Sequence, residues 1–423
     1  MREMKDSGVE WIGEIPKEWK IDKIKYHLKR NEPKNHGNAI VLSVYRDYGV
    51  IPKDSRDDNH NVTSEDTSKY KYVKKGQLVI NKMKAWQGSL AVSDYNGIVS
   101  PAYFIYDFTD EEYNHKYFHY LVRSCYKEEF KRISGGIREG QWDLSPEAFA
   151  NTLALLPPLV EQKYIANYLD IQCSEIDATA EDIQKEISLL EEYKKSVITE
   201  AVTKGLNPDA EMKDSGIKWI GKIPINWQAV NPRWLFAQRK DRAKKGMEQY
   251  TASQKYGVIS QKDYMNRIGG SIVTVQKDFD ILKMVCEGDF VIHMRSFQGG
   301  LEYSEHTGSI SSAYVMLIPQ KNTGECRYFK WLFKSASYIN ALQSTSNLIR
   351  DGQAMRYSNF IQIIIPYPPL DEQQQIADYL DSKCSEIDAI IADKKRQRGI
   401  LADYKKSLIY EYVTGKKEVP INE

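Results

Sequence analysis

The sequence predicts an α+β protein in which two mixed α/β domains, in a pseudo-two-fold arrangement, are joined by two long antiparallel helices that form a coiled coil. Three observations lead to this fold class. Two stretches recur about half a chain apart, each copy holds a β-rich block, and each copy ends in a long proline-free segment with apolar residues at heptad spacing. The 423 residues give ample length for two cores.

The first repeat is "MKDSGVEWIGEIPKEW" at 4–19, which agrees with "MKDSGIKWIGKIPINW" at 212–227 in eleven of sixteen positions. The second is "LPPLVEQKYIANYLDIQCSEIDA" at 156–178, which agrees with 367–389 in sixteen of 23 positions. A period of half the chain is too long for a solenoid repeat. The repeats therefore indicate two copies of one module, a domain followed by a connecting helix.

We assign the domain boundaries from these repeats. The first domain covers 1–155 and the first spacer helix 156–205. A linker and the second domain cover 206–365, and the second spacer helix with a C-terminal tail covers 366–423. Short apolar runs such as "QLVINKM", turn dipeptides and a few helical stretches predict mixed α/β structure in each domain.

Each spacer segment starts with Pro-Pro, a pair that cannot continue a preceding helix. A helix of roughly 40 residues is about 60 Å long, which favours a spacer with an apolar seam. The predicted seam residues are Leu169, Ile176, Ile183, Ile187, Leu190 and Val197 in the first helix, and Leu380, Ile387, Ile391, Leu401 and Leu408 in the second. Lys394, Arg398 and Gly399 interrupt the second seam, so we expect it to be weaker at its centre.

Charge is distributed unevenly along the chain. Residues 160–204 hold ten acids and five bases, a net −5, and residues 371–415 hold nine acids and seven bases, a net −2. Since the whole chain is +1, the remainder carries +1 − (−7) = +8. Basic domains favour a partner that bears phosphates, although an excess of this size is also compatible with an ordinary surface.

Several classes of protein are disfavoured by the sequence. No apolar run is long enough to cross a membrane, the N-terminus has no apolar signal region, and the five cysteines form no CxxC pair. We therefore expect a cytoplasmic protein without membrane contact. The phosphate-binding pattern GxxxxGK[ST] and the dinucleotide-binding pattern GxGxxG are absent. His115 and His119 are four residues apart, but neighbouring aromatic residues favour an ordinary helix, and we predict neither catalytic nor metal-binding residues.

The candidate DNA contacts are two polar patterns that recur in both halves, together with hairpin residues that differ between the halves. Arg and Lys bind guanine, and Gln binds adenine, through paired hydrogen bonds, whereas Gly lets a loop approach the groove closely. The candidates are Tyr45, Arg46, Lys82, Lys84, Gln87, Arg138 and Gln141 in the first half, and Gln254, Lys255, His293, Arg295, Gln298, Arg350 and Gln353 in the second. The shared Gln-Gly and Arg-acid-Gly-Gln elements are equally compatible with structural turns. Base contacts are expected where the halves differ.

The motif order resembles that of the specificity subunits of type I restriction-modification systems. The residues that carry the resemblance are "DSGVEWIGEIPKEW" and "DSGIKWIGKIPINW", "LPPLVEQKYIANYLD" and "YPPLDEQQQIADYLD", and the helix ends "YKKSVITEAVT" and "YKKSLIYEYVT". The resemblance implies two target-recognition domains, each binding one half of a bipartite, asymmetric site in double-stranded DNA. It also implies a coiled coil that sets the spacing between the half-sites.

The resemblance further implies the partners. The chain itself would need no cofactor and would catalyse nothing. Two modification subunits would bind S-adenosylmethionine and methylate adenine N6, and two restriction subunits would use ATP and Mg²⁺ to translocate and cut DNA. Two alternatives remain at the level of sequence, namely a coiled-coil scaffold that joins two protein-binding domains, and a stand-alone methyltransferase, which the missing motifs disfavour.

Overall fold

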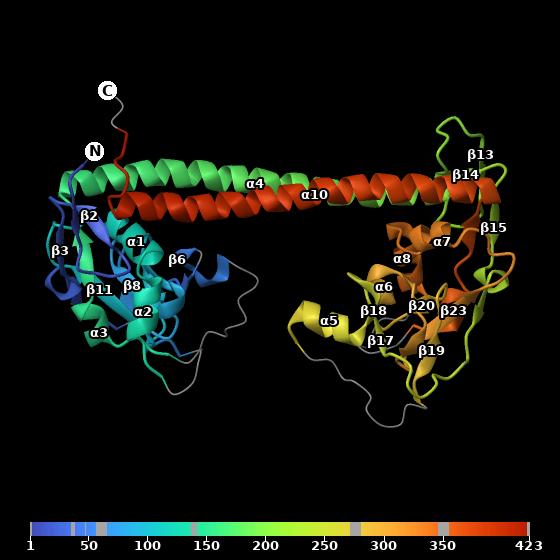
Figure 1. Cartoon of the computed structure of the whole chain (residues 1–423), viewed down its shortest axis with the longest axis horizontal. Helices are drawn as coiled ribbons and strands as arrows, with labels where there is room; N and C mark the ends of the chain where they lie inside the picture. Colours follow the sequence, from blue (N-terminus) through green and yellow to red (C-terminus); the bar gives the residue numbers. More distant parts are fainter. Residues whose placement is uncertain are drawn as a thin grey trace. The chain divides into compact units, whose positions relative to one another are not determined.

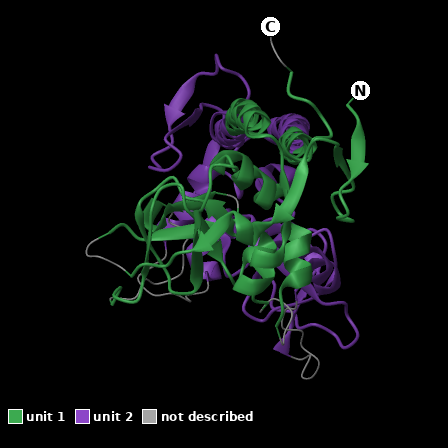
Figure 2. Cartoon of the chain, turned by 90° about the vertical axis from the view of Figure 1, so that its left-hand side faces the viewer, with its two compact units in different colours: residues 1–183, 396–423 green, residues 184–395 purple. Residues whose placement is uncertain are grey.

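The contacts within the chain divide it into two units, which Figure 2 shows in two colours. The computed structural model describes residues 2–34, 39–46, 48–55, 66–136, 142–270, 281–345 and 355–420. Unit 1 comprises residues 1–183 and 396–423, and unit 2 comprises residues 184–395. Each unit therefore contains one domain and a segment of each of the two long helices.

The domain of unit 1 is built on a four-stranded antiparallel sheet with the order β4-β11-β8-β9 (Figure 1). Paired strands β1-β2, β3-β12, β5-β6 and β7-β10 surround it. The strand bounds are β1 Met4–Asp6, β2 Glu14–Pro16, β3 Lys20–Lys23, β4 Leu28–Arg30, β5 Leu42–Tyr45, β6 Gly49–Pro52, β7 Lys71–Val73, β8 Leu78–Asn81, β9 Leu90–Val92, β10 Gly97–Val99, β11 Tyr103–Phe108 and β12 Leu153–Leu156. The helices are η1 Ile24–Tyr26, η2 Lys53–Ser55, η3 Ala85–Gln87, α1 His115–Ser124, α2 Lys127–Ile133 and α3 Pro146–Asn151.

Strand β8 explains why this sheet is covered on both faces. All its residues are buried, and side chains alternate between the faces of a strand. Leu78 and Ile80 pack in the cluster that contains the aromatic residues of α1, whereas Val79 packs in a second cluster with β5 and β6. The apolar run thus separates a helical layer from a hairpin layer.

The domain of unit 2 has the same topology, with the sheet order β16-β23-β20-β21. Its strands are β13 Met212–Asp214, β14 Lys222–Pro224, β15 Gln228–Val230, β16 Phe236–Gln238, β17 Tyr250–Ser253, β18 Gly257–Ser260, β19 Lys283–Val285, β20 Phe290–Ile292, β21 Glu302–Tyr303, β22 Gly308–Ile310, β23 Val315–Pro319 and β24 Ile365–Tyr367. Its helices are η4 Pro232–Trp234, α5 Gln261–Ile268, α6 Ser296–Gly299, α7 Cys326–Leu332, α8 Ala336–Ser344 and α9 Tyr357–Phe360. Phe290 and Ile292 pack in an apolar cluster with residues of α7 and α8, called here the helical cluster of unit 2. Val291 packs in a second cluster with residues of β17 and β18.

The domains differ after the hairpin that packs on this sheet. In unit 2, strand β18 leads directly into α5, an eight-residue helix. In unit 1, β6 leads at the corresponding place into the three-residue turn η2. The two domains therefore share a frame but carry different structures at this point.

The long helices are α4, Leu159–Lys204, and α10, Leu370–Val413. In unit 1, Lys405 Nζ lies 2.7 Å from Asp177 Oδ2, and the Tyr412 hydroxyl donates to that of Tyr168 at 3.3 Å. Residue numbers rise along one helix as they fall along the other, so the helices are antiparallel within this unit.

Unit 2 shows the same direction and the same ion pair. Lys194 Nζ lies 2.6 Å from Asp388 Oδ2, and these residues correspond to Lys405 and Asp177 at the repeat offset of 211. The predicted fold class is confirmed, with mixed α/β domains and two long helices that pair antiparallel in each unit.

The structure places the predicted seam residues mainly in the interior. Leu190 and Leu401 are half-buried. The others are buried, namely Leu169, Ile176, Ile183, Ile187, Val197, Leu380, Ile387, Ile391 and Leu408. Some seam residues also belong to the cores of the domains. Leu169 and Leu408 pack in the cluster of unit 1 that contains the aromatic residues of α1, and Leu380 packs in the helical cluster of unit 2.

The predicted interruption of the second seam does not break the helix. Lys394 takes the position that Ile183 has in the first copy, and its Nζ lies 2.5 Å from Glu186 Oε2 on the facing helix. Helix α10 runs without a break through Gly399, where an added Cβ would meet no atom within 4 Å. An ion pair thus replaces an apolar contact near the centre of the seam.

The repeated opening motif forms the joint between each domain and its long helix. Trp19 is fully buried and its Nε1 donates to Glu161 Oε2 at 2.9 Å, near the start of α4. Trp227 repeats this contact, with its Nε1 2.6 Å from Glu372 Oε2 near the start of α10. The motif therefore holds the domain to the helix that follows it.

A second set of contacts joins each domain to the other long helix. The Tyr117 hydroxyl donates to the carbonyl of Val413 at 2.9 Å, and the Tyr328 hydroxyl donates to that of Val202 at 3.0 Å. These residues again correspond at an offset of 211. Each domain is thus fixed to both helices of its unit by one duplicated set of contacts.

No helix in the described part of the chain combines the length and the apolar character that crossing a membrane requires.

Candidate nucleic-acid interface

Two sets of predicted candidates, the hairpin residues 45–46 and the Gln-Gly turn, come together in the domain of unit 1. The turn after β8 contains Lys84 and η3, and Gly88 ends it at φ 91°. A Cβ at Gly88 would lie 3.8 Å from Arg46 Cγ, which places the tip of the β5–β6 hairpin against this turn. The Arg123 guanidinium donates to the carbonyl of Arg46 at 2.5 Å and ties the tip to α1.

Unit 2 repeats the arrangement with different side chains. Gln254, at the tip of the β17–β18 hairpin, donates through Nε2 to the carbonyl of Arg295 at 3.0 Å. A Cβ at Gly299 would lie 2.6 Å from Gln254 Cγ, so the absence of a side chain allows the hairpin to pack on the turn. In each domain, residues far apart in sequence thus form one polar surface, called here the tip surface, composed of 45–46 with 82–88 in unit 1 and 253–256 with 293–299 in unit 2.

The structure separates the predicted candidates by exposure. The exposed ones are Arg46, Lys84, Gln254, Lys255, Arg295 and Gln298. The half-buried ones are Tyr45, Lys82 and Gln87. Lys82 Nζ lies 2.7 Å from Asp143 Oδ2, so this lysine is already paired within the protein.

His293 is poorly placed for a contact with DNA. Its side chain is 5% exposed, and its Nδ1 accepts from the backbone N–H of Arg295 at 3.3 Å. Its Nε2 lies 3.6 Å from Glu302 Oε1, and Glu302 also accepts from Lys334. The buried His293 side chain therefore supports, from the protein interior, the turn on which Arg295 is exposed.

The Arg-acid-Gly-Gln elements lie outside the described residues. Arg138, Gln141, Arg350 and Gln353 therefore remain predictions from the sequence.

The sequence-based candidates omitted Tyr256 and α5. The Tyr256 ring lies beneath two cations, with Lys255 Nζ 5.0 Å and Arg267 Cζ 5.1 Å from its centroid. The sequence does carry a signal for α5, because Ser260 with Asp263 is a typical helix start and Gly269 a typical helix end. Nothing in the sequence predicts that side chains of α5 contact the β17–β18 hairpin.

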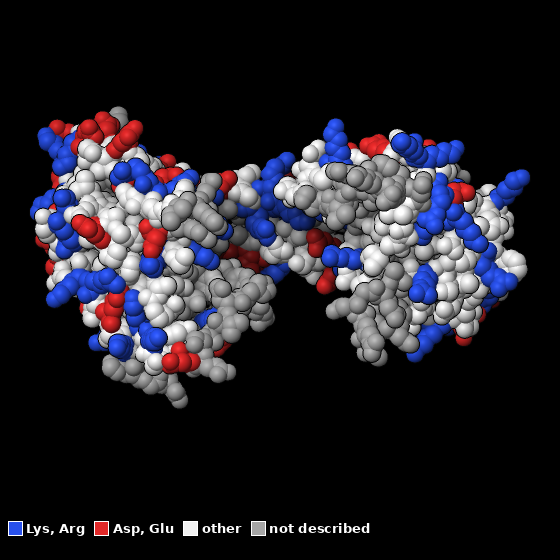
Figure 3. All heavy atoms as spheres, turned by 90° about the horizontal axis from the view of Figure 1, so that it is seen from below, with Lys and Arg blue, Asp and Glu red and all other residues white. Residues whose placement is uncertain are grey.

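The charge that the sequence assigns to the domains is concentrated in one of them. Residues 206–365 contain 21 bases and 14 acids, a net +7, whereas residues 1–155 contain 24 bases and 23 acids, a net +1. Figure 3 shows the corresponding surfaces, with mainly basic side chains on the domain of unit 2 at the right and mixed charges at the left. The second domain therefore has the stronger attraction for a polyanion.

One group among the described residues could hold a metal ion, namely His27, Asp110 and Glu112. His27 is buried, its Nδ1 lies 2.9 Å from Asp110 Oδ2, and its Nε2 lies 3.5 Å from Asp22 Oδ2. The ring thus has one hydrogen-bonded carboxylate, that of Asp110 at Nδ1, while Asp22 only lies near Nε2.

His119, considered above as a metal ligand, has other contacts. Its Nδ1 accepts from the backbone N–H of Val92 at 3.3 Å, and its Nε2 lies 3.0 Å from Arg123 NH1. Burial, with the nearby Arg123 cation, lowers the pKa of His119 to about 3. The neutral imidazole thus orients Arg123, which in turn holds the hairpin tip at Arg46.

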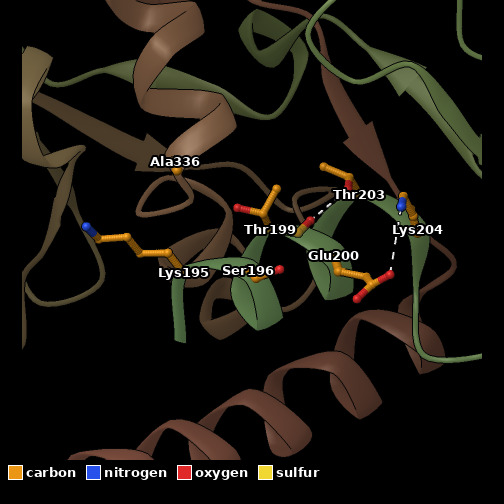
Figure 4. Close-up of a pocket in the computed structure, with 7 residues that line it drawn as sticks. All are labelled: Lys195, Ser196, Thr199, Glu200, Thr203, Lys204 and Ala336. Carbon is orange, nitrogen blue, oxygen red and sulfur yellow. Dashed lines mark hydrogen bonds and ion pairs between the residues drawn. The ribbon is translucent and has the colours of Figure 1, made fainter. Parts of the chain in front are cut away.

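A hollow of about 310 Å³ lies beside the end of α4 and is shown in Figure 4. Thr203 Oγ1 donates to the carbonyl of Thr199, and Lys204 Nζ lies 3.7 Å from Glu200 Oε1, while Lys195 extends away from these groups. Its polar groups pair along the helix and do not converge on a common point, so the hollow has no features of a catalytic site.

Residues 224–397 match the family model described as "Type I restriction modification DNA specificity domain". Residues 224–397 of this chain are therefore similar to the specificity domain of that family. The resemblance predicted from the repeated motifs is confirmed.

Similar proteins extend the match to nearly the whole chain. The MjaVIII type I restriction enzyme specificity subunit of Methanocaldococcus jannaschii is 23% identical over 421 residues, which cover 96% of this chain and 94% of that protein. The HsdS subunit from Thermoanaerobacter tengcongensis shares the fold with a TM-score of 0.52 at 14% identity, covering 97% of this chain and 100% of that one.

A chain from a structure on complex assembly and conformational transition of the type I R-M system shares the fold with a TM-score of 0.69 at 13% identity. The match covers 95% of this chain and 99% of that one. The fold shared with these structures therefore extends over both modules of this chain.

Proposed function

We propose that the chain is the sequence-specific DNA-binding subunit of a type I restriction-modification complex, and that each domain binds one half of a bipartite, asymmetric site. One observation carries the proposal beyond the family match. The contacts that fix each domain to the helices are the same in both units, whereas the tip surfaces differ, with Arg46 and Lys84 in one and Gln254, Lys255 and Arg295 in the other. A duplicated frame with two different polar surfaces suits a site with two different halves.

The long helices are proposed to set the spacing between the half-sites. The ion pairs Lys405–Asp177 and Lys194–Asp388 fix the register of the two helices in their respective units. Inserting or deleting residues in α4 and α10 should then change the length of the spacer in the DNA site while the recognised bases stay the same.

The chemistry is proposed to reside in partner subunits. By the family resemblance, two modification subunits would bind S-adenosylmethionine and methylate adenine N6, and two restriction subunits would use ATP and Mg²⁺. The purified chain, incubated with S-adenosylmethionine and its DNA site, should transfer no methyl group until a modification subunit is added. Methyl transfer by the chain alone would contradict this assignment.

The long helices also offer equivalent apolar positions for these partners. Leu189 and Ile400 correspond in the two copies and are 64% and 61% exposed. Tyr193 and Tyr404 also correspond and are 50% and 52% exposed. Exposed apolar residues at matching positions support two docking sites for copies of one partner, one in each unit.

Selection from random DNA duplexes tests the function directly. The full chain should enrich a split motif with a fixed gap, and its affinity should fall steeply as salt rises, because phosphate contacts release counterions. Replacing residues 20–150 by the corresponding domain of another specificity subunit should change one half-site and leave the other intact. A chain that binds no DNA, or binds without salt dependence, would instead support the coiled-coil scaffold.

A further inference from the structure

We propose that α5, together with the β17–β18 turn, is the element with which the second domain recognises its half-site, and that Lys262, Asn266 and Arg267 contact the DNA. This inference rests on the proposed function and goes beyond it, since it assigns base recognition to a helix that the first domain does not have in its described residues.

Helix α5 forms locally and contributes little to the core. The Ser260 hydroxyl accepts from the backbone N–H of Asp263 at 3.1 Å and caps the start, and Gly269 ends the helix at φ 64°. None of the residues of α5, all of which the structure describes, is buried. Since the core does not need these side chains, their identity is available for binding a ligand.

The Tyr256 ring, in the β17–β18 turn, restricts two cationic side chains, Lys255 of the same turn and Arg267 of α5. Tyr256 is half-buried, with Lys255 Nζ and Arg267 Cζ each near 5 Å from its ring centroid, at 5.0 and 5.1 Å. The Tyr264 ring packs edge-on against Tyr256 with centroids 6.2 Å apart, which links the helix to the turn. Restricting long cationic side chains before binding lowers the conformational entropy that is lost when DNA binds.

The charge of the element fits a polyanion. Residues 254–268 contain three bases, Lys255, Lys262 and Arg267, and a single acid, Asp263. The Asp263 carboxylate is already engaged, since it accepts from the Ser260 hydroxyl at 3.0 Å. The adjoining turn adds Arg295, whose carbonyl is bonded to Gln254.

The geometry of α5 fits the major groove, whose width admits an α-helix. Lys262 and Asn266 are exposed and four residues apart, so they lie on one face of the helix with Arg267 beside them. Asn pairs with adenine and Arg with guanine through two hydrogen bonds each, and Lys contacts guanine or phosphate. An acidic protein surface would satisfy the cations but would give Asn266 no comparable role.

The experiment compares binding-site selection by the full wild-type chain and by an Arg267→Ala chain on random DNA duplexes. Selection by an Arg46→Ala chain identifies the half-site bound by the first domain, because the base preference should change only in that half. Lys222→Ala, an exposed lysine on β14 away from the hairpin, controls for loss of one charge in the same domain. We expect Arg267→Ala to lose the preference at one or two bases of a single half-site and to weaken binding to the parent site about 5- to 150-fold.

Asn266→Ala should relax a different base of the same half-site. Thermal unfolding should change little for either variant, because neither side chain is buried and Arg267→Ala removes only one exposed cation–π contact. The inference is overturned if Arg267→Ala selects the parent motif, weakens binding equally for all sequences, or alters the half-site marked by Arg46→Ala. Failure of the wild-type chain to select any split motif would instead reject the proposed function, so the two failures are distinct.

Discussion

The two domains of this chain have the same frame and different surfaces. Sheet order, helix order and the contacts to the long helices repeat from one domain to the other. The net charge does not repeat, at +1 for residues 1–155 and +7 for residues 206–365. Among the described residues, the segment after the hairpin does not repeat either, since it begins with η2 in one domain and with α5 in the other. The comparison shows that shared residues hold the fold, whereas residues that differ form the exposed part of the tip surfaces.

The largest expected effect on the shared frame is the loss of stability when the buried tryptophan is removed from each joint. Trp19→Ala and Trp227→Ala should each destabilise their own unit by about 3–5 kcal/mol, because a large buried side chain is lost and a cavity remains. Hydrogen exchange of backbone amides, followed unit by unit, measures the effect. If one variant had little effect on its unit, the joints would not be equivalent.

Mild acid should distinguish the units. The pKa of His119 is lowered to about 3 by burial, while in the unfolded chain it lies near the ordinary value of 6.5. Between these values the unfolded state binds more protons, so stability is lost as pH falls, by roughly 2 kcal/mol at pH 5. The corresponding residue of unit 2 is Lys330, which is 46% exposed, so unit 2 has no buried histidine at this position.

Unit 1 should therefore lose amide protection between pH 6.5 and 4.5 more than unit 2. His119→Gln keeps an acceptor for the backbone N–H of Val92 and should reduce the difference, leaving the smaller contribution of His115, whose pKa burial also lowers. Equal loss in both units, or an unchanged pH profile for the variant, would contradict this explanation.

A smaller effect is expected where the two long helices differ. Gly399 lies in the interior of α10 with open space around its missing Cβ, whereas Ser188 is at the corresponding position of α4. Gly399→Ala should stabilise unit 1 by about 1 kcal/mol, the difference in helix propensity, and Ser188→Ala should stabilise unit 2 by less. Thermal unfolding of both variants checks the order, and a destabilised Gly399→Ala chain would mean that this glycine has a packing role.

The smallest effect is expected from the duplicated ion pairs. Lys194→Ala and Lys405→Ala each remove one partially exposed pair between the helices, which should cost about 0.2–1 kcal/mol. The two losses should be similar, and both should shrink at high salt. Denaturant unfolding at two salt concentrations measures this, and a large loss in one unit alone would show that the registers depend on different contacts.

The repeats in the sequence were sufficient to predict the fold class. Identical residues at nearly constant offsets indicate a duplicated module, and heptad spacing of apolar residues indicates a long helix. The tip surfaces were predicted in part. Arg46, Lys84, Gln254 and Arg295 are exposed and lie beside one another in their domains, since residues that differ between copies of one fold tend to lie on its surface.

The failures concern properties that depend on tertiary contacts. His293 looked like a polar surface residue, but the chain folds it beneath the turn next to Glu302. Lys82 had no visible partner in the sequence because Asp143 is 61 residues away. Tyr256 was overlooked since its role depends on Arg267, which only the packing of α5 against the hairpin brings near.

The duplicated joint has a consequence for how such a protein can change over generations. Glu161, Asp170 and the carbonyl of Val413 receive the first domain, and Glu372, Asp381 and the carbonyl of Val202 receive the second through equivalent atoms. A gene segment that encodes either domain could therefore recombine into either position and meet matching contacts. New pairings of half-sites could then arise by exchange of existing domains, without new mutations in the frame.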